Sequence, residues 1–116
     1  MFNDNIIWTV QGAVSDRDAL ESLMREMVEA VRPEPGTINY EWTLSEDGET
    51  LHVYERYRDA DAAMAHLPTW SEYQDRFMDL VDVESFVVYS ELTDDLKEKV
   101  SGLGPVYMTP IGGFAK

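Results

Sequence analysis

The chain has 116 residues, of which 44% are hydrophobic, a formal net charge of −14 and no cysteine. This length supports one core, and the negative charge repels both nucleic-acid phosphates and anionic membranes. Without cysteine there is no disulfide, thiolate nucleophile or cysteine-ligated metal, which suits a reducing cytoplasm. We therefore expect a cytoplasmic domain that binds neither nucleic acid nor membranes.

A strand and a helix are predicted first. Apolar residues occupy both faces of the stretch from Asn5 to Val14, which indicates a strand buried on both sides. Ser15 is a suitable N-cap for a helix that ends before Pro33. The apolar residues of this helix recur at helical spacing, at Leu20, Leu23, Met24, Met27, Val28 and Val31.

The stretch from Pro35 to Tyr57 predicts a β-hairpin. Asp47 and Gly48 favour a two-residue turn, because both central residues of such a turn need positive φ. The register that follows pairs residues of one face across the two strands: Leu44 with Leu51, Trp42 with Val53, Tyr40 with Glu55 and Ile38 with Tyr57. Glu55 is the polar residue that interrupts this apolar face, which helices must cover.

Two further helices and a last strand follow. The stretch from Asp59 to Leu67 predicts a helix that Pro68 breaks, and another helix begins near Thr69. The apolar side of this next helix carries Trp70, Tyr73, Phe77, Leu80 and Val81. The stretch from Ser85 to Leu92 predicts a strand with apolar residues on both faces.

The C-terminal segment lies outside this pattern. A short helix is expected from Asp94 to Val100, ended by glycines, and an apolar tail follows it. We divide the chain into a domain of residues 1–93 and a segment of residues 94–116 that packs on the same domain or on a partner chain. The tail from Val106 to Phe114 is expected to lie over the partner or to close a pocket.

The predicted order is strand, helix, strand, strand, helix, strand, which is typical of the α+β ferredoxin-like βαββαβ fold. In this fold, helices cover one face of an antiparallel sheet. Because the first and last main strands are apolar on both faces, the other face also needs a cover. We therefore predict a homodimer in which two sheets pack face to face.

The run EPGTINYEWTLSEDGETLHVYERYRDADAAMAHL resembles the antibiotic biosynthesis monooxygenase superfamily. The shared motifs are a Pro-Gly-led strand, an acidic hairpin, a Glu-Arg-Tyr strand end and an Ala-His-Leu helix, and the likeness covers residues 5 to 92. It implies a dimeric α/β barrel with a ligand cavity between the sheet and helices of each subunit. In the quinol monooxygenase-like branch, it implies oxidation of a quinol, anthrone or polycyclic phenol by molecular oxygen without metal, flavin or haem.

The resemblance also implies two site positions. That branch places an Asn and a Trp four residues apart; here Trp70 matches the Trp, and His66 stands where the branch has Asn. A histidine can donate a hydrogen bond at this place or act as a base near neutral pH. A haem-degrading branch uses a histidine further along the same helix, and the sequence has none between Tyr73 and Val81, so no haem is expected.

Each candidate residue has a structural alternative. Trp70 is either a wall against an aromatic substrate or a core anchor, and His66 is either a catalytic group or a partly exposed helix residue. Glu55 is either a buried carboxylate that holds a proton near neutral pH or one fully hydrogen-bonded for structure. The candidate substrate-binding residues, which core packing would also explain, are Tyr40, Trp42, Tyr73 and Phe77.

The opposite face of the hairpin carries four further polar residues, which form either a second site or contacts between subunits: Asn39, Glu41, His52 and Arg56. Two histidines on different elements make no metal signature, so neither a metal nor another cofactor is expected.

The leading hypothesis is a cofactor-independent monooxygenase with Trp70, His66, Tyr40 and Glu55 around its cavity. One alternative is a non-catalytic or stress-related dimer that holds a small aromatic or apolar ligand. Another is a non-redox isomerase on the same scaffold, because fold does not determine function.

Overall fold

Five strands pair into one mixed sheet in the order β2-β3-β1-β4-β5. The structure, a computed structural model, describes residues 5–116. Its strands are β1 (Ile6–Val14), β2 (Thr37–Leu44), β3 (Thr50–Tyr57), β4 (Val81–Val88) and β5 (Val106–Tyr107), and its helices are α1 (Arg17–Val31), α2 (Ala60–Leu80) and α3 (Asp94–Ser101). The first four strands pair antiparallel, and β5 runs parallel to β4.

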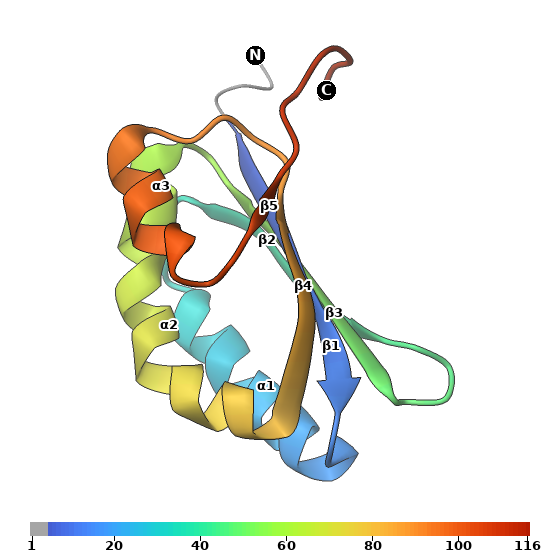
Figure 1. Ribbon diagram of the computed structural model, residues 1–116. Helices are drawn as coiled ribbons and strands as arrows, with labels where there is room; N and C mark the ends of the chain where they lie inside the picture. The colour runs from blue at the N-terminus through green and yellow to red at the C-terminus, as the bar shows by residue number, and fades with distance from the viewer. Residues whose placement is uncertain (1–4) are drawn as a thin grey trace.

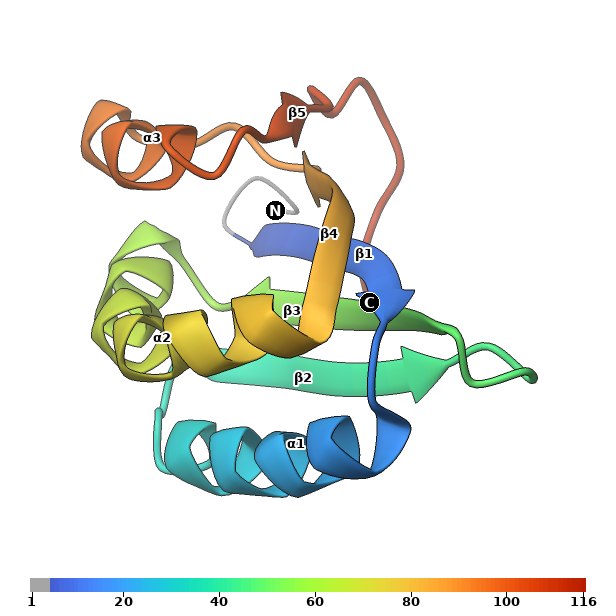
Figure 2. The same ribbon diagram turned by 60° about the horizontal axis from the view of Figure 1, so that its bottom comes forward.

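The three helices lie on the same side of the sheet (Figure 1). A second view places α1 near β2 at one edge of the sheet and α3 near β5 at the other (Figure 2). This arrangement confirms the predicted α+β ferredoxin-like fold, with α3 and β5 added after its last strand. The sheet of a single chain does not close on itself, because its edges are the different strands β2 and β5.

The β2–β3 hairpin has the predicted register over most of its length. Leu44 pairs with Leu51, Trp42 with Val53 and Tyr40 with Glu55. The prediction fails at the open end, where the register shifts and Tyr57 pairs with Thr37 instead of Ile38. The extra residue turns Ile38 away from the core, and its side chain is 49% exposed.

The hairpin turn is longer than predicted. The turn is a four-residue loop between Ser45 and Thr50, and the Ser45 N–H donates to the Thr50 carbonyl at 2.9 Å. Gly48 has a φ of 75°, but Asp47 has no positive φ. The Asp47 carboxylate instead accepts from the Ser45 hydroxyl at 2.7 Å and from the Glu49 N–H at 2.9 Å. Asp47 therefore holds the loop by side-chain hydrogen bonds, as Asx turns do.

The N-cap of α1 is Asp16, one residue later than predicted. Its carboxylate accepts from the Ala19 N–H at 3.0 Å, while the Ser15 hydroxyl donates to the Leu80 carbonyl at 3.2 Å. The predicted apolar side is buried at Leu20, Leu23, Met27 and Val31.

Pro68 does not break the second helical region, as the sequence had suggested. One helix, α2, continues through it for 21 residues. Proline removes one backbone donor, but its φ suits a helix, and packing can offset the lost bond. Here the buried His66 and Phe77, on either side of Pro68, are 11 residues apart and so share one face. The next strand, β4, begins directly after α2 at Val81, earlier than the predicted Ser85, and ends at Val88.

Two clusters of buried side chains hold the helices to the sheet. One joins α3 and the start of α2 to β1, β3 and β4 through Ile6, Trp8, Tyr57, Ala62, Ala63, Phe86, Val88, Leu96 and Val100. The other joins α1 and the end of α2 to the sheet through Leu20, Leu23, Met27, Leu51, Val53, Phe77 and Val81. Val10, on the central strand β1, packs against both clusters.

The C-terminal segment is buried at its start and exposed at its end. Leu96 and Val100 of α3 are 0% exposed, whereas Ile111 and Phe114 of the tail are 101% and 80% exposed. Among the described residues, no helix has both the length and the apolar character needed to cross a membrane.

Candidate active site

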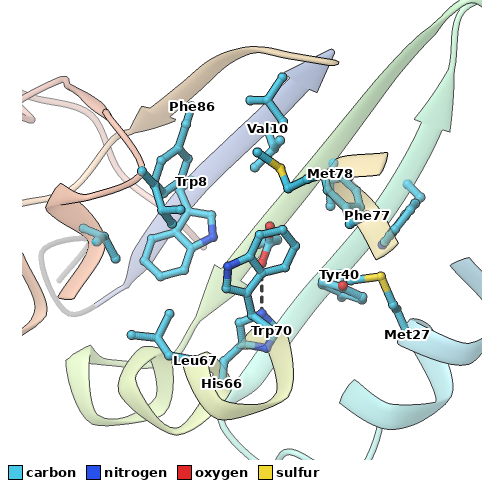
Figure 3. Close-up of a pocket in the computed structure, with 16 residues that line it drawn as sticks. Trp8, Val10, Met27, Tyr40, His66, Leu67, Trp70, Phe77, Met78 and Phe86 are labelled. Carbon is cyan, nitrogen blue, oxygen red and sulfur yellow. Dashed lines mark ion pairs between the residues drawn. The ribbon is translucent and has the colours of Figure 1, made fainter. Parts of the chain in front are cut away.

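An apolar cavity of about 80 Å³ lies between the sheet and the helices (Figure 3). Its lining comes from all three helices and the first four strands: Trp8, Val10, Met27, Tyr40, Trp42, Val53, Glu55, His66, Leu67, Trp70, Phe77, Met78, Val83, Phe86 and Val100, with Leu103 from the turn after α3. Six of the seven site residues predicted from the sequence are in this lining, and Tyr73 is not. Tyr73 instead lies beneath the Arg76 guanidinium, whose carbon is 5.9 Å from the ring centroid.

Strand pairing arranges the cavity floor in two rows that cross the sheet from β2 to β4. One row passes through Tyr40, Glu55, Trp8 and Val88, and the other through Trp42, Val53, Val10 and Phe86. In the first row, the hydroxyl of Tyr40 comes from β2 and the carboxylate of Glu55 comes from β3. The floor therefore changes from polar to apolar from the hairpin toward β4.

His66 lies between two carboxylates at the polar end of the floor. Its Nδ1 is 3.0 Å from Glu34 Oε1, and its Nε2 is 3.4 Å from Glu55 Oε1. Glu34 lies in the loop between α1 and β2, where its Oε1 also accepts from the Thr37 hydroxyl at 2.7 Å. His66 is 3% exposed. It is therefore buried, which excludes the alternative that it is a partly exposed helix residue.

The two carboxylates determine the charge of His66. Burial lowers the pKa of this imidazole, but the hydrogen bonds that it donates to Glu34 and Glu55 and the charges of these carboxylates raise the pKa overall to about 9. Burial likewise opposes ionisation of Glu34, yet His66 and Thr37 hold the pKa of this carboxyl below its usual range. At neutral pH the ring is therefore an imidazolium whose two N–H groups face carboxylates. This state can donate hydrogen bonds but has no lone pair with which to act as a base.

Glu55 is the carboxylate of the cavity lining. Its Oε1 accepts from the Tyr57 hydroxyl at 2.5 Å and faces His66. Both contacts of this carboxylate fall on its Oε1. Glu55 is 7% exposed, so its carboxylate is a hydrogen-bond acceptor in a cavity lined mostly by apolar and aromatic groups.

Tyr40 supplies a donor beside Glu55, its partner in the strand pairing. Burial, followed by the charge of Glu55, raises the pKa of the Tyr40 phenol, so the hydroxyl keeps its proton. The indole N–H of Trp42 approaches this hydroxyl without completing a hydrogen bond, and it is a buried donor without a partner among the described residues. The site thus combines a carboxylate acceptor with a phenol donor.

Aromatic rings enclose this polar pair. Phe77 packs edge-on against Trp42 and Trp70, with centroid distances of 5.7 and 5.3 Å. Figure 3 shows the Trp70 indole in front of His66, over the cavity. Trp70 is therefore both a wall of the cavity and a packing partner of Phe77.

Glu34 and Tyr57 are the polar partners of the site residues that the sequence did not reveal, and the apolar lining from β1, β4 and the C-terminal segment was not predicted either. Glu34 lies in a loop between Pro33 and Pro35, where no periodicity predicts the direction of a side chain. Tyr57 was placed on the correct face of its strand, but its hydroxyl contact depends on the position of Glu55 two residues earlier. A buried carboxylate beside a tyrosine on the same face is the signal that could have suggested this bond.

The polar residues of the opposite hairpin face form separate contacts. Asn39 donates to Glu41 at 2.7 Å, and Arg56 donates to the Asn5 side chain at 2.8 and 3.0 Å. In the part of the chain that the structure describes, no group of three or more histidine and acidic side chains is placed to hold a metal ion.

The family model described as "Antibiotic biosynthesis monooxygenase" matches residues 7–81, which include both strands of the hairpin and the whole of α2. The chain belongs to this family. Membership supports a monooxygenase-type function at the level of the family. No curated protein matches the chain.

Solved structures share the family fold. MupZ from Pseudomonas fluorescens superimposes with a TM-score of 0.88 at 19% identity, covering 98% of this chain and 91% of that one. Rv0793 from Mycobacterium tuberculosis gives 0.65 at 26% identity, over 78% of this chain and 97% of that one. SnoaB from Streptomyces nogalater, a cofactor-independent oxygenase, gives 0.66 at 15% identity, over 78% and 95%. Because the superposition with MupZ covers 98% of this chain, it includes most of the C-terminal segment.

Proposed function

We propose that the protein oxidises a quinol, anthrone or polycyclic phenol with molecular oxygen, without a cofactor. The observation that carries this proposal is the buried Glu55 carboxylate beside the protonated Tyr40 hydroxyl, in a cavity lined mostly by apolar and aromatic groups. Two comparisons add support to this proposal. The chain belongs to the antibiotic biosynthesis monooxygenase family, and SnoaB, a cofactor-independent oxygenase, has the same fold.

In the proposed reaction, Glu55 takes a proton from the substrate. An ionised phenol or enol can pass one electron to molecular oxygen, and the resulting radical and superoxide combine at carbon to form a peroxide. Loss of water then leaves a carbonyl. For an anthrone, the CH₂ group and one O₂ become a C=O group and one water, so atoms and electrons balance. The protein must supply the base, hold the substrate and exclude bulk water.

Tyr40 and His66 would assist the proton transfer without leaving their positions. The Tyr40 hydroxyl can donate to the substrate oxygen that becomes negative. His66 and its two carboxylates carry a net charge of one negative unit, and moving a proton from substrate to Glu55 leaves the total charge of the site unchanged. The buried site therefore gains no second uncompensated charge, which would be costly.

The cavity must widen when the substrate binds. Its volume is about 80 Å³, whereas pockets for drug-sized ligands measure about 300 Å³ or more. Met78 and Leu103 are the lining side chains with a large exposed surface, at 48% and 36%, and are free to move outward. We infer that these two side chains shift on binding.

Oxygen uptake by the metal-free protein tests the proposal. The substrates would be hydroquinones, naphthalenediols and anthrones, and the variant Glu55→Gln would be compared with Glu72→Gln, which is exposed on α2 and outside the cavity lining. We expect saturable uptake that falls at least about 100-fold in Glu55→Gln, because general base catalysis contributes about 10²–10⁴-fold. Glu72→Gln should match the parent protein. No uptake above autoxidation by the folded parent protein would refute the proposal.

A second candidate function is proton transfer without oxidation, as in an isomerase. The same pair of Glu55 and Tyr40 favours it, since neither group needs oxygen to act. Solvent deuterium exchange at the CH₂ group of anthrone, measured without oxygen, separates the two functions. Exchange in the absence of any oxygen uptake would favour the isomerase, and binding without either reaction would favour a non-catalytic ligand carrier.

We also propose that the protein acts as a homodimer through the helix-free face of its sheet. Ile7, Tyr54 and Val87 are only partly buried on this face in a single chain, and an apolar cover would stabilise them. The exposed tail, with Ile111 and Phe114, would pack on the partner. Light scattering after size exclusion at micromolar concentration should give the mass of a dimer, and a stable monomer would contradict it.

A further inference from the structure

The C-terminal segment builds one wall of the cavity. Val100 of α3 and Leu103 of the following turn line the cavity together with Trp8 and Phe86. Both lie beyond residues 7–81, the part that the family model matches. The family match therefore does not describe the ligand contacts that this wall provides.

Local interactions place this wall firmly. The Thr93 side chain caps α3 by accepting from the Leu96 N–H at 3.3 Å, and Leu96 and Val100 are fully buried. After α3, the Leu103 N–H donates to the Val100 carbonyl at 3.0 Å, and Gly104 takes the left-handed φ of 68° that ends the turn. These bonds fix the backbone of Leu103 beside the cavity, while its side chain remains free to change rotamer when a ligand binds.

The wall faces the apolar end of the cavity floor. Trp8 is the β1 partner of Glu55, and Phe86 is the β4 partner of Val10. Since neighbouring strands lie about 4.8 Å apart, β4 is roughly 10 Å from the strand that carries Glu55. Figure 3 likewise shows Trp8 and Phe86 together on one side of the cavity and Tyr40 on the other. A substrate with its reacting oxygen between Tyr40 and Glu55 can extend its remaining rings across the sheet to this wall.

We infer that Val100 and Leu103 select substrates that carry a further ring or an apolar substituent fused beside the ring with the reacting oxygen. The inference rests on the proposed function for the position of that oxygen. A single-ring hydroquinone bound at Tyr40 and Glu55 leaves the wall uncovered, whereas one of the outer rings of anthrone extends toward it. The C-terminal segment is then a determinant of substrate size, and the chemistry stays with the hairpin and α2.

Ligand binding without oxygen tests this inference apart from the reaction. All three tryptophans of the chain line the cavity, so quenching of their fluorescence reports occupancy. Anthrone and hydroquinone would be titrated into Leu103→Phe and Leu103→Ala. The matched controls are Ile111→Phe and Ile111→Ala, because Ile111 lies in the same segment but is fully exposed and outside the cavity.

We expect Leu103→Phe to weaken anthrone binding about tenfold or more, since one carbon group in an apolar pocket changes affinity by that factor. Leu103→Ala should weaken it several-fold through lost contact, and hydroquinone affinity should change less than about twofold in both. The Ile111 variants should bind like the parent protein. An anthrone-to-hydroquinone affinity ratio that is the same in all four variants would overturn the inference, as would a parent protein that does not bind anthrone.

Oxygen uptake by the same variants separates this inference from the proposed reaction. If the Leu103 variants change the affinity ratio but the parent protein consumes no oxygen, substrate selection by the wall is supported and the proposed oxidation is refuted. If the parent protein consumes oxygen with anthrone and the affinity ratio is unchanged, the oxidation is supported and substrate selection by the wall is refuted.

Discussion

Each face of the β2–β3 hairpin carries a glutamate, but only one of the two glutamates lies in the candidate site. Under the helices, Glu55 is 7% exposed and is joined to Tyr57 and His66. On the other face, Glu41 is exposed and bonds only its neighbour Asn39. Water screens exposed charges, whereas buried charges must be paired and so acquire defined protonation states. Burial by α2, rather than residue type, makes the difference.

The largest expected effect comes from removing a partner of the buried imidazolium. Glu34→Ala leaves His66 without its closest carboxylate, and breaking a buried pair costs about 3–5 kcal/mol of unfolding free energy. The control is Glu29→Ala, which removes an exposed contact to Arg32 and should cost less than about 1 kcal/mol. Urea unfolding measures both. Equal effects would show that the Glu34–His66 pair adds no stability.

The next largest effect is expected from deprotonation of His66, which should make the unfolding free energy depend on pH. Its folded pKa, about 9, is raised above the unfolded value of 6.5, so its stabilisation is complete below pH 6.5 and is lost as the pH rises through 9. The loss is roughly 3 kcal/mol. Unfolding curves at pH 6 and pH 10 should show it in the parent protein and in His52→Gln. The same decrease in His66→Gln would contradict the assignment.

A smaller effect is expected at Tyr57. Tyr57→Phe removes the hydrogen bond to Glu55, which should cost about 1–3 kcal/mol because the carboxylate oxygen loses a buried donor. Tyr73→Phe, on α2 and outside the cavity lining, should stay within about 0.5 kcal/mol of the parent protein. Thermal unfolding compares the two, and equal midpoints would place the Glu55 oxygen in contact with water.

The smallest effect is expected at Trp70. Trp70→Phe keeps an aromatic wall but reduces its area, so kcat or KM for anthrone should change less than about tenfold, equivalent to 1.4 kcal/mol. The variant should stay folded. Tyr73→Phe serves as the control, because Tyr73 lies outside the cavity lining. Kinetics of Trp70→Phe that match those of the control would remove Trp70 from the site.

Periodicity predicted most of the fold, because the formation of its strands and helices depends on short-range rules. The alternation around Tyr40 and Trp42 indicated the strand face and its partners, and that face is the cavity floor. The errors occur where two local preferences compete. Pro68 disfavours a helix interior, yet packing on both sides of it keeps α2 continuous. Ile38 fits the alternation, but a register shift turns it outward.

The candidate site was predicted only in part, because a sequence pattern places residues on faces but does not join elements. Glu55 and His66 were expected at the cavity and line it. The contact between Glu34 and His66 requires the loop after α1 to reach α2, across 32 residues of sequence. Tyr73 illustrates the opposite case, since its helical spacing matches that of the lining residues while its ring points elsewhere.

By itself, the sequence determined the order of elements, the ferredoxin-like fold and the polar residue that interrupts the hairpin's apolar face. These features follow from side-chain periods and turn residues, which act over a few positions. Only the tertiary structure decided the charge of His66, the contacts of the buried Glu55 carboxylate and the wall formed by Val100 and Leu103. Each of these depends on burial and on distances between segments that are remote in the chain, and electrostatic and packing energies are functions of those distances.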